Sequence, residues 1–307
     1  NQLQGVAGGQ ALPSTLVFDH PTARQLASVL QPEQATSVAA EPVTSPLTPT
    51  RGGVGIGGMS ALFPSGASSL QPASWAVIGG HNAIVQVPAA RWDLRGQPLL
   101  PEPFASRVRH GGFVRGAELV DNVAFAVSPA EVAAMDPCQR LLLELGYAAL
   151  HGAATDRIAL GGSLAGVFLG FAGSAFAQAL ASSSPTGGGS VYAATGSASS
   201  IACGRLSYAL GLHGPCVSYD TACSAALAAC HAGLRALQLD ECSTGLVAGV
   251  TLMFAPCIGT SFAIAGMTSA RGRSHTFDAR ADGYARGEAC GGVVLRGGVE
   301  GGALCLL

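Results

Sequence analysis

The chain has 307 residues, which is enough for one large domain or two smaller ones with a buried core. Apolar residues make up 49% and charged residues only 11%; the sixteen basic residues are all arginine, and the formal net charge is −2. Because there is no basic block to attract a phosphate backbone, we expect no binding to nucleic acid.

The low charge raises the question of a membrane. Two uncharged runs, residues 158–204 and 245–267, are long enough to span a bilayer. Both are rich in small residues, and neither has the leucine density or the basic flanks of a spanning helix. We therefore expect buried strands and closely packed helices there, and no membrane association.

Nine cysteines are scattered along the chain, without a C-x-x-C pair or a Cys/His cluster at zinc spacing. No secretory signal opens the sequence. The sequence therefore predicts free thiols, no metal site and a reducing, cytoplasmic location.

The first segment, residues 1–32, carries too little apolar surface to fold alone, although Thr22 can cap a short helix near its end. Residues 33–53 hold several prolines among Ser, Thr and Ala, a composition typical of a linker. We expect the folded domain to begin at residue 54.

From residue 54 onward the pattern indicates alternating strands and helices, and therefore a layered α/β fold. An amphipathic helix is predicted over 135–150, with Asp136 as its cap and Pro137 at its first position. The short apolar runs that predict buried strands are 166–170, 217–219, 246–250 and 292–295.

The strand at 217–219 runs directly into the sequence D-T-A-C-S, residues 220–224. A helical pattern follows, and we expect its apolar face to consist of Ala226, Leu227, Cys230, Leu234 and Leu237. This places Cys223 at a strand-to-helix turn. The positive end of a helix favours a thiolate, and free backbone N–H groups there can hold the oxyanion of a tetrahedral intermediate.

Cys223 is therefore the candidate nucleophile. The other cysteines are predicted to be small buried apolar residues, as free Cys commonly is. They are Cys138, Cys203, Cys216, Cys230, Cys242, Cys257, Cys290 and Cys305.

The run at 220–224 resembles D-T-A-C-S-S-S, the active-site signature of β-ketoacyl synthases in modular polyketide synthases and related fatty acid synthases. Further landmarks of that family follow one another in its order from residue 54 to about 296. They are V-G-I-G-G-M at 54–59 with F-P at 63–64, V-P-A-A-R-W-D at 87–93, G-G-F at 111–113, M-D-P-C-Q-R-L-L-L-E at 135–144, T-G at 195–196, G-R-L-S-Y at 204–208 and F-D-A-R-A-D-G-Y-A-R-G-E at 277–288.

The resemblance implies a thiolase-like layered αβαβα fold, a homodimer, and an acyl group carried on Cys223. The acyl chain would come from a phosphopantetheine thiol, a group expected on a partner acyl carrier domain, with no cofactor bound in this chain. A carrier-bound malonyl-type extender would then lose CO2 and attack the acyl-Cys, a covalent route that divides one difficult step into two.

The family also uses two histidines, in H-G-T-G-T and N-x-G-H motifs, and a lysine, all well beyond the cysteine. This sequence contains neither motif and no lysine. No histidine is therefore assigned a catalytic role; His231, eight residues after Cys223, is about 12 Å of helical rise away from it. Residues 54–296 are expected to form the incomplete front half of the synthase, inactive alone, with 297–307 a divergent tail.

The first segment also resembles a known domain. L-P-S-T-L-V-F-D-H-P-T at 12–22 is similar to the C-terminal end of acyl carrier domains. Carrier remnant (1–32), linker (33–53) and synthase (54–296) follow one another as they do across a module boundary of a polyketide synthase.

Three other interpretations stay open. A non-catalytic ketosynthase-like scaffold would keep Cys223 without condensing activity. A thiolase or a cysteine hydrolase would pass the acyl group to coenzyme A or to water. Residues 53–58 also fit G-x-G-x-x-G, but a dinucleotide site needs a preceding strand and an acidic residue about 20 positions on. Neither is present, since no Asp or Glu occurs between Glu41 and Asp93.

Overall fold

The computed structural model of the protein describes residues 53–92, 100–183 and 190–298. The predicted carrier remnant (1–32), nearly all of the linker (33–53), Asp93 and Cys305 lie outside these residues, as does most of the tail (297–307).

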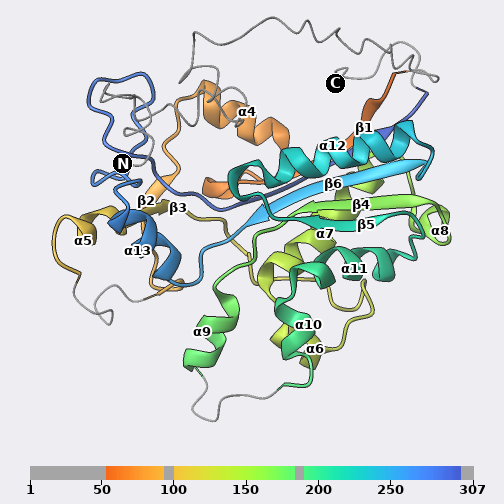
Figure 1. The fold of residues 1–307 in the computed structure, drawn as a ribbon, viewed down its shortest axis with the longest axis horizontal. Helices are drawn as coiled ribbons and strands as arrows, with labels where there is room; N and C mark the ends of the chain where they lie inside the picture. Colours follow the sequence, from red (N-terminus) through yellow and green to blue (C-terminus); the bar gives the residue numbers. More distant parts are fainter. Residues whose placement is uncertain (1–52, 93–99, 184–189, 299–307) are drawn as a thin grey trace, which may run out of the picture. The chain divides into compact units, whose positions relative to one another are not determined.

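A five-stranded mixed sheet forms the centre of the domain (Figure 1). Three strands run parallel, in the order β6, β4, β5. Beyond β6, β7 pairs antiparallel with β6 and β1 pairs antiparallel with β7. The strands are β1 (Gly55–Leu62), β4 (Ala165–Gly170), β5 (Cys216–Tyr219), β6 (Thr244–Thr251) and β7 (Ala289–Arg296).

The strands predicted at 166–170, 217–219, 246–250 and 292–295 are confirmed. β4 is buried at every residue, which explains why its sequence is apolar without alternation. Its consecutive side chains enter two different cores, Val167 and Leu169 on one face of the sheet and Phe168 on the other.

Helices cover both faces of the sheet. α12 (Ala225–Gln238) packs on β4 and β6 at the Phe168 face. α7 (Pro137–Gly152) and α11 (Ser199–Leu210) lie below the opposite face in Figure 1, α7 against β1, β6 and β7 and α11 against β4 and β5. The structure thus has the layered α/β architecture that the pattern of elements predicts.

α7 confirms the helix predicted at 135–150. Asp136 precedes it, and the side chain of Asp136 accepts a hydrogen bond from the Cys138 N–H at 2.8 Å, while Pro137 occupies the first helical position. A capping carboxylate and a proline that needs no N–H partner suit a helix start.

The remaining elements are shorter and surround the sheet. β2 and β3 form a separate two-stranded antiparallel ladder. The full set is η1 (Pro64–Gly66), α4 (Leu70–Ile78), β2 (Ile84–Gln86), α5 (Phe104–Arg107), β3 (His110–Gly112), α6 (Pro129–Ala134), α8 (Arg157–Leu160), α9 (Phe176–Ser183), α10 (Ala193–Ser197), η2 (Ala222–Ser224) and α13 (Cys257–Ile264).

The two uncharged runs do not form spanning helices. Within the described ranges no helix is both long and apolar enough to cross a bilayer. The described part of 158–204 folds into β4 and α9 to α11, and 245–267 folds into β6 and α13. Burial explains the low charge of β4 and of the buried half of β6, whereas α9, α10 and α13 are largely exposed or half-buried.

The G-x-G-x-x-G match at 53–58 lies mostly inside a strand. Residues from Gly55 onward belong to β1, which pairs with β7, so they do not form a phosphate-binding loop ahead of a helix. Gly58 instead allows α7 to pack closely, since a Cβ at this position would lie 2.3 Å from the Ala149 carbonyl oxygen. The dinucleotide interpretation is therefore wrong.

Candidate active site

Cys223 lies where β5 passes into α12. β5 ends at Tyr219, the 3-10 turn η2 spans Ala222–Ser224, and α12 begins at Ala225. The Cys223 side chain is exposed. The predicted strand-to-helix position is therefore confirmed, with the α-helix starting two residues after the cysteine. A thiol placed here can be approached from solvent.

The turn that carries Cys223 is held by local hydrogen bonds. The Ser224 hydroxyl donates to the Thr221 carbonyl at 2.8 Å, and the Ala222 N–H donates to the Asp220 carboxylate at 3.3 Å. Ala222 has φ of 55°, a left-handed conformation that costs a non-glycine residue about 1–2 kcal/mol. The turn immediately before the exposed Cys223 is thus strained.

Two paired glycines let the start of α12 approach the sheet. Gly170 and Gly249 are partners in the β4–β6 register. A Cβ on Gly170 would lie 2.5 Å from the Ala226 nitrogen, and a Cβ on Gly249 would lie 3.1 Å from the Ala226 Cβ. The first turn of α12, and with it Cys223, therefore sits at the carboxyl edge of the parallel strands.

The predicted apolar face of α12 is confirmed only in part: Leu237 is buried, and Cys230 and Leu234 are half-buried against the same core. Leu227, expected on the apolar face, is 73% exposed, while the residues facing the sheet are Ala225, Ala229, Gly233, Ala236 and Leu237. The cause is the close approach of the helix: a Cβ on Gly233 would already lie 3.0 Å from Val247. Only small side chains fit there, and the prediction therefore failed at Leu227.

The prediction for the other cysteines holds only in part. Cys138, Cys203, Cys242 and Cys290 are buried. Cys230 and Cys257 are half-buried.

Cys216 contradicts the prediction, because it is exposed on β5. β5 is the last strand of the described sheet, so its outer edge lacks a covering neighbour.

Cys203 is the rival thiol for a nucleophilic role. A hydrogen bond with Cys216 lowers the pKa of Cys203 to about 6. Cys203 is nevertheless only 3% exposed, on α11 beneath the sheet. A thioester carried by a second domain cannot reach it, so the exposed Cys223 remains the better candidate.

The sequence assigned neither a histidine nor a metal ion to the Cys223 site. His231 is exposed on α12, eight residues after Cys223. Among the described residues no group of three or more His, Cys, Asp or Glu side chains is arranged to hold a metal ion.

Two of the sequence landmarks meet in a buried ion pair. Arg91, from V-P-A-A-R-W-D, donates to both carboxylate oxygens of Glu288, from Y-A-R-G-E, at 3.0 and 2.8 Å. The same carboxylate accepts the backbone N–H groups of Val114 and Met253, both at 2.9 Å. Arg91 and Glu288 therefore hold four distant segments together, and their charged groups are occupied by these contacts.

A second group of landmark residues joins α7 to α10 and α11. The Gln139 side-chain amide donates to the Thr195 and Ala198 carbonyls at 3.2 Å, and its oxygen accepts Arg205 Nε at 2.9 Å. Asp136 accepts the Ser174 hydroxyl at 2.6 Å. Spacing in the sequence gives no sign of these contacts, which only the fold creates.

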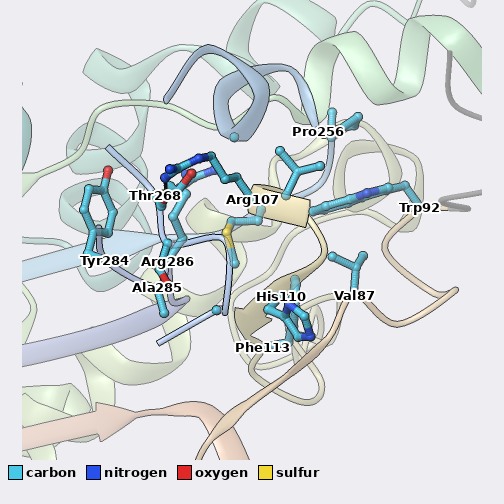
Figure 2. Close-up of a pocket in the computed structure, with 16 residues that line it drawn as sticks. Val87, Trp92, Arg107, His110, Phe113, Pro256, Thr268, Tyr284, Ala285 and Arg286 are labelled. Atoms are coloured by element: carbon cyan, nitrogen blue, oxygen red, sulfur yellow. Dashed lines mark hydrogen bonds between the residues drawn. The ribbon is translucent and has the colours of Figure 1, made fainter. Parts of the chain in front are cut away.

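A pocket that the sequence did not predict lies beside α13 (Figure 2). It encloses about 430 Å³ of atom-free space, open solvent at its mouth included. Trp92 and Pro256 lie on one side in Figure 2, and Thr268, Tyr284 and Arg286 lie on the other. Trp92 and Arg286 belong to recognised landmarks, but nothing in the sequence indicates that they share a cavity.

Comparison with known proteins identifies the family of this fold. The family model "Beta-ketoacyl synthase, N-terminal domain" matches residues 52–299. Polyketide synthase GfsB of Streptomyces halstedii is 41% identical over 294 residues, and the pikromycin polyketide synthase component PikAII of Streptomyces venezuelae is 40% identical over 298. Each match covers 94% of this chain but only 5% and 8% of the relative.

Solved ketosynthases have the same fold. The ketosynthase from module 6 of the bacillaene synthase of Bacillus subtilis 168 (a cysteine-to-serine mutant) matches with a TM-score of 0.69 and 30% identity, over 79% of this chain and 40% of that one. The oxazolomycin ketosynthase domain OzmH KS7 of Streptomyces albus JA3453 matches with a TM-score of 0.69 and 26% identity, over 80% and 42%. The predicted thiolase-like layered fold is thereby confirmed, and the chain spans about two fifths of these domains. Residues 52–299 match the family by sequence and the described domain matches it by fold, so this chain belongs to the β-ketoacyl synthase family, as a ketosynthase region of the polyketide synthase type.

Proposed function

We propose that Cys223 accepts an acyl chain from a phosphopantetheine thioester, in the first half of a β-ketoacyl synthase reaction. The observation that carries this proposal is the exposed thiol on a strained turn at the start of α12. The family relationship indicates the class of reaction, and the position of Cys223 indicates which residue carries the acyl group.

The acyl transfer needs a nucleophile and a stabilised oxyanion. The Cys223 thiolate attacks the thioester carbonyl carbon, the tetrahedral intermediate collapses, and the pantetheine thiolate leaves as the acyl-Cys bond forms. Backbone N–H groups at the beginning of α12 point toward the developing negative charge, where the helix dipole also favours an anion. Both effects follow from a cysteine that precedes the helix.

Condensation would follow on the same sulfur. A carrier-bound malonyl-type extender loses CO2, the resulting enolate carbon forms a bond to the acyl carbonyl, and the Cys223 thiolate is released. The product is a β-ketoacyl thioester on the carrier. In this proposal the described residues perform the acyl transfer alone, and the histidines that the family uses for decarboxylation act from outside them.

The proposed partners are an acyl carrier domain bearing the thioesters and a second copy of this chain. β5 supports the second copy, because in the described sheet it hydrogen-bonds only to β4 and exposes Cys216 and Val217. An unpaired strand edge is a ready template for another strand.

We also propose that residues 1–32 are the C-terminal remnant of an acyl carrier domain and that residues 33–53 are a linker. The family model covers 52–299, which is 248 of the 307 residues, whereas the polyketide synthase matches cover 94% of the chain. Those matches therefore extend into the residues before 52, where multidomain synthases carry further sequence.

The first prediction concerns acyl labelling. An acyl thioester of pantetheine should modify Cys223, and Cys223→Ala should abolish the adduct because, among the described cysteines, only Cys223 is both exposed and placed at a helix start. Peptide mass spectrometry locates the label. Cys216→Ala, which removes an exposed thiol from the same region, is the matched control and should label as the wild type does.

Three results would decide against the proposal. Equal labelling of wild type and Cys223→Ala would assign the acyl group to another residue. A folded wild-type chain that takes up no label would favour the non-catalytic scaffold. Transfer of the label to coenzyme A or rapid hydrolysis would instead indicate a thiolase or a cysteine hydrolase.

A further inference from the structure

Two thiols lie against each other where α11 packs on β5. Cys216 is the register partner of Val167, whose side chain enters the core on the α11 face of the sheet, so Cys216 points toward α11. Cys203 is buried on α11. The two side chains form a hydrogen bond with each other, which brings their sulfur atoms into contact.

The neighbouring serines show that this contact is set by the way the strand lies on the helix. Ser199, Cys203 and Ser207 follow one another at intervals of four on α11 and therefore share one face. Cys216 and Ser218 are two apart on β5 and also share a face. Cys216 forms a second hydrogen bond, with Ser207. Ser218 is hydrogen-bonded to Cys203, and its hydroxyl lies 2.7 Å from the Ser199 carbonyl oxygen. The two faces interleave, so the thiols meet in the ordinary register of the fold.

The hydrogen bond between the two thiols makes the pair acidic. It lowers the pKa of Cys203 to about 6 and raises the pKa of Cys216. Because the two sulfurs share one proton, they titrate as a unit, and the pair carries one negative charge at neutral pH. A thiolate is the reactive form of cysteine. Burial instead raises the pKa of Cys138 and of Cys290, and these two thiols therefore stay protonated.

Exposure distinguishes the two members of the pair. Cys216 is exposed on β5, the last strand of the described sheet, whereas Cys203 is only 3% exposed. A small dissolved oxidant therefore meets Cys216 first, with a second thiol in contact behind it. Redox-sensing cysteines show the same combination of thiolate character, exposure and an adjacent resolving thiol. In the reducing compartment that the sequence predicts, a disulfide formed here is transient.

We propose that Cys203 and Cys216 are a site of reversible oxidation, at which a hydroperoxide converts the two thiols into a disulfide that joins α11 to β5. The Cys216 thiolate attacks one peroxide oxygen, the O–O bond breaks, and hydroxide or an alkoxide leaves. The Cys203 sulfur then attacks the sulfur of the Cys216 sulfenic acid. The S–O bond breaks, and the hydroxyl leaves with the Cys203 proton as water. The pair loses two electrons, and the hydroperoxide gains them.

Peptide mapping of the full 307-residue chain tests the site. The chain is reduced, freed of reductant, treated with hydrogen peroxide and blocked with N-ethylmaleimide. Trypsin cuts after Arg205, which places Cys203 in peptide 158–205 and Cys216 in peptide 206–235. We expect these two peptides to be joined after oxidation. The intact chain should lose two hydrogen atoms before blocking, and dithiothreitol should reverse both changes.

Variants assign the link to its sulfurs, because peptide 206–235 also contains Cys223 and Cys230. Cys216→Ser and Cys203→Ser should each abolish the joined peptides. Cys230→Ser is the matched control and should keep them, since Cys230 is half-buried on α12 and burial raises its pKa. Circular dichroism checks that each variant folds. If Cys203→Ser does not fold, Cys203→Ala takes its place.

Oxidation of Cys216 without the link in the wild type, or a link that persists in Cys216→Ser, would refute the site. A link found only between two copies of the chain on a non-reducing gel would refute it as well. Cys223→Ala should form the link as the wild type does. The outcome is therefore independent of the acyl-labelling experiment, and each proposal can fail alone.

Discussion

The buried carboxylate of Glu288 connects several distant segments of this domain. Its side chain is fully buried, and it accepts four hydrogen bonds from Arg91, Val114 and Met253. A buried ion pair is costly to desolvate, but removing one partner leaves an uncompensated buried charge. The pair is therefore a point at which a single substitution has a large effect.

We predict that Glu288→Gln lowers the free energy of unfolding by about 3–5 kcal/mol, because Arg91 then remains charged and buried without its partner. Urea denaturation followed by circular dichroism measures the change. Asp278→Asn is the control: it removes the exposed Arg280–Asp278 pair and should leave the urea midpoint nearly unchanged. Similar urea midpoints for both variants would show that the buried Arg91–Glu288 pair does not stabilise the fold as we infer.

For single residues, the sequence predicted Cys223 as the nucleophile, but it did not predict most of the contacts between residues distant in the chain. The D-T-A-C-S run predicted Cys223 as the nucleophile, and the apolar pattern predicted its position between a strand and a helix, which the structure confirms. The Arg91–Glu288 pair spans 197 positions, and Arg286 and Trp92, also far apart in the chain, line the same pocket. Local pattern carries no information on contacts of that separation.

The α12 helix illustrates how an element is set by what it packs on. Its small-residue face lies on the glycine pair of β4 and β6, and the leucine-based pattern was therefore right for Leu237 but wrong for Leu227. Helix α7 was easier to predict, since its cap, proline and leucines all agree with the face that it buries.

We predict that Gly170→Ala destabilises the domain by about 1–3 kcal/mol, the usual cost of overpacking, because its Cβ would lie 2.5 Å from the Ala226 nitrogen and displace α12. The displaced helix should also slow acylation of Cys223 in the labelling assay. Thermal and urea unfolding measure the first effect.

Gly204→Ala serves as the control for that variant. Gly204 lies inside α11 with open space where its Cβ would be, so alanine should stabilise the helix by about 0.5–1 kcal/mol. Loss of stability in Gly204→Ala, or none in Gly170→Ala, would contradict the packing explanation.

The open edge of β5 makes a prediction about assembly. Val217→Lys places a charge on that edge and should shift the proposed dimer toward monomer, as charged residues do on exposed edge strands. Analytical ultracentrifugation reports the change. Ile158→Lys, on α8 and 90% exposed, is the control and should leave the dimer intact. Equal association of both variants would exclude β5 as the contact.

For the molecule as a whole, the sequence predicted the class of fold and the strands of the parallel core. It did not predict strand order, because β1 and β7 reach the sheet from opposite ends of the domain. Nor did it predict that Cys216 is exposed, since an apolar strand looks the same in the middle of a sheet and at its edge.

The antiparallel pairing of β1 with β7 has a consequence for folding during translation. Leu62 pairs with Cys290 and Gly55 with Arg296, so the partners are separated by 228 to 241 positions. At about 5–20 residues per second, a ribosome needs on the order of 10–50 s to deliver the second strand after the first. During that interval β1 lacks its partner strand β7. The sheet can be completed only after translation has passed residue 296.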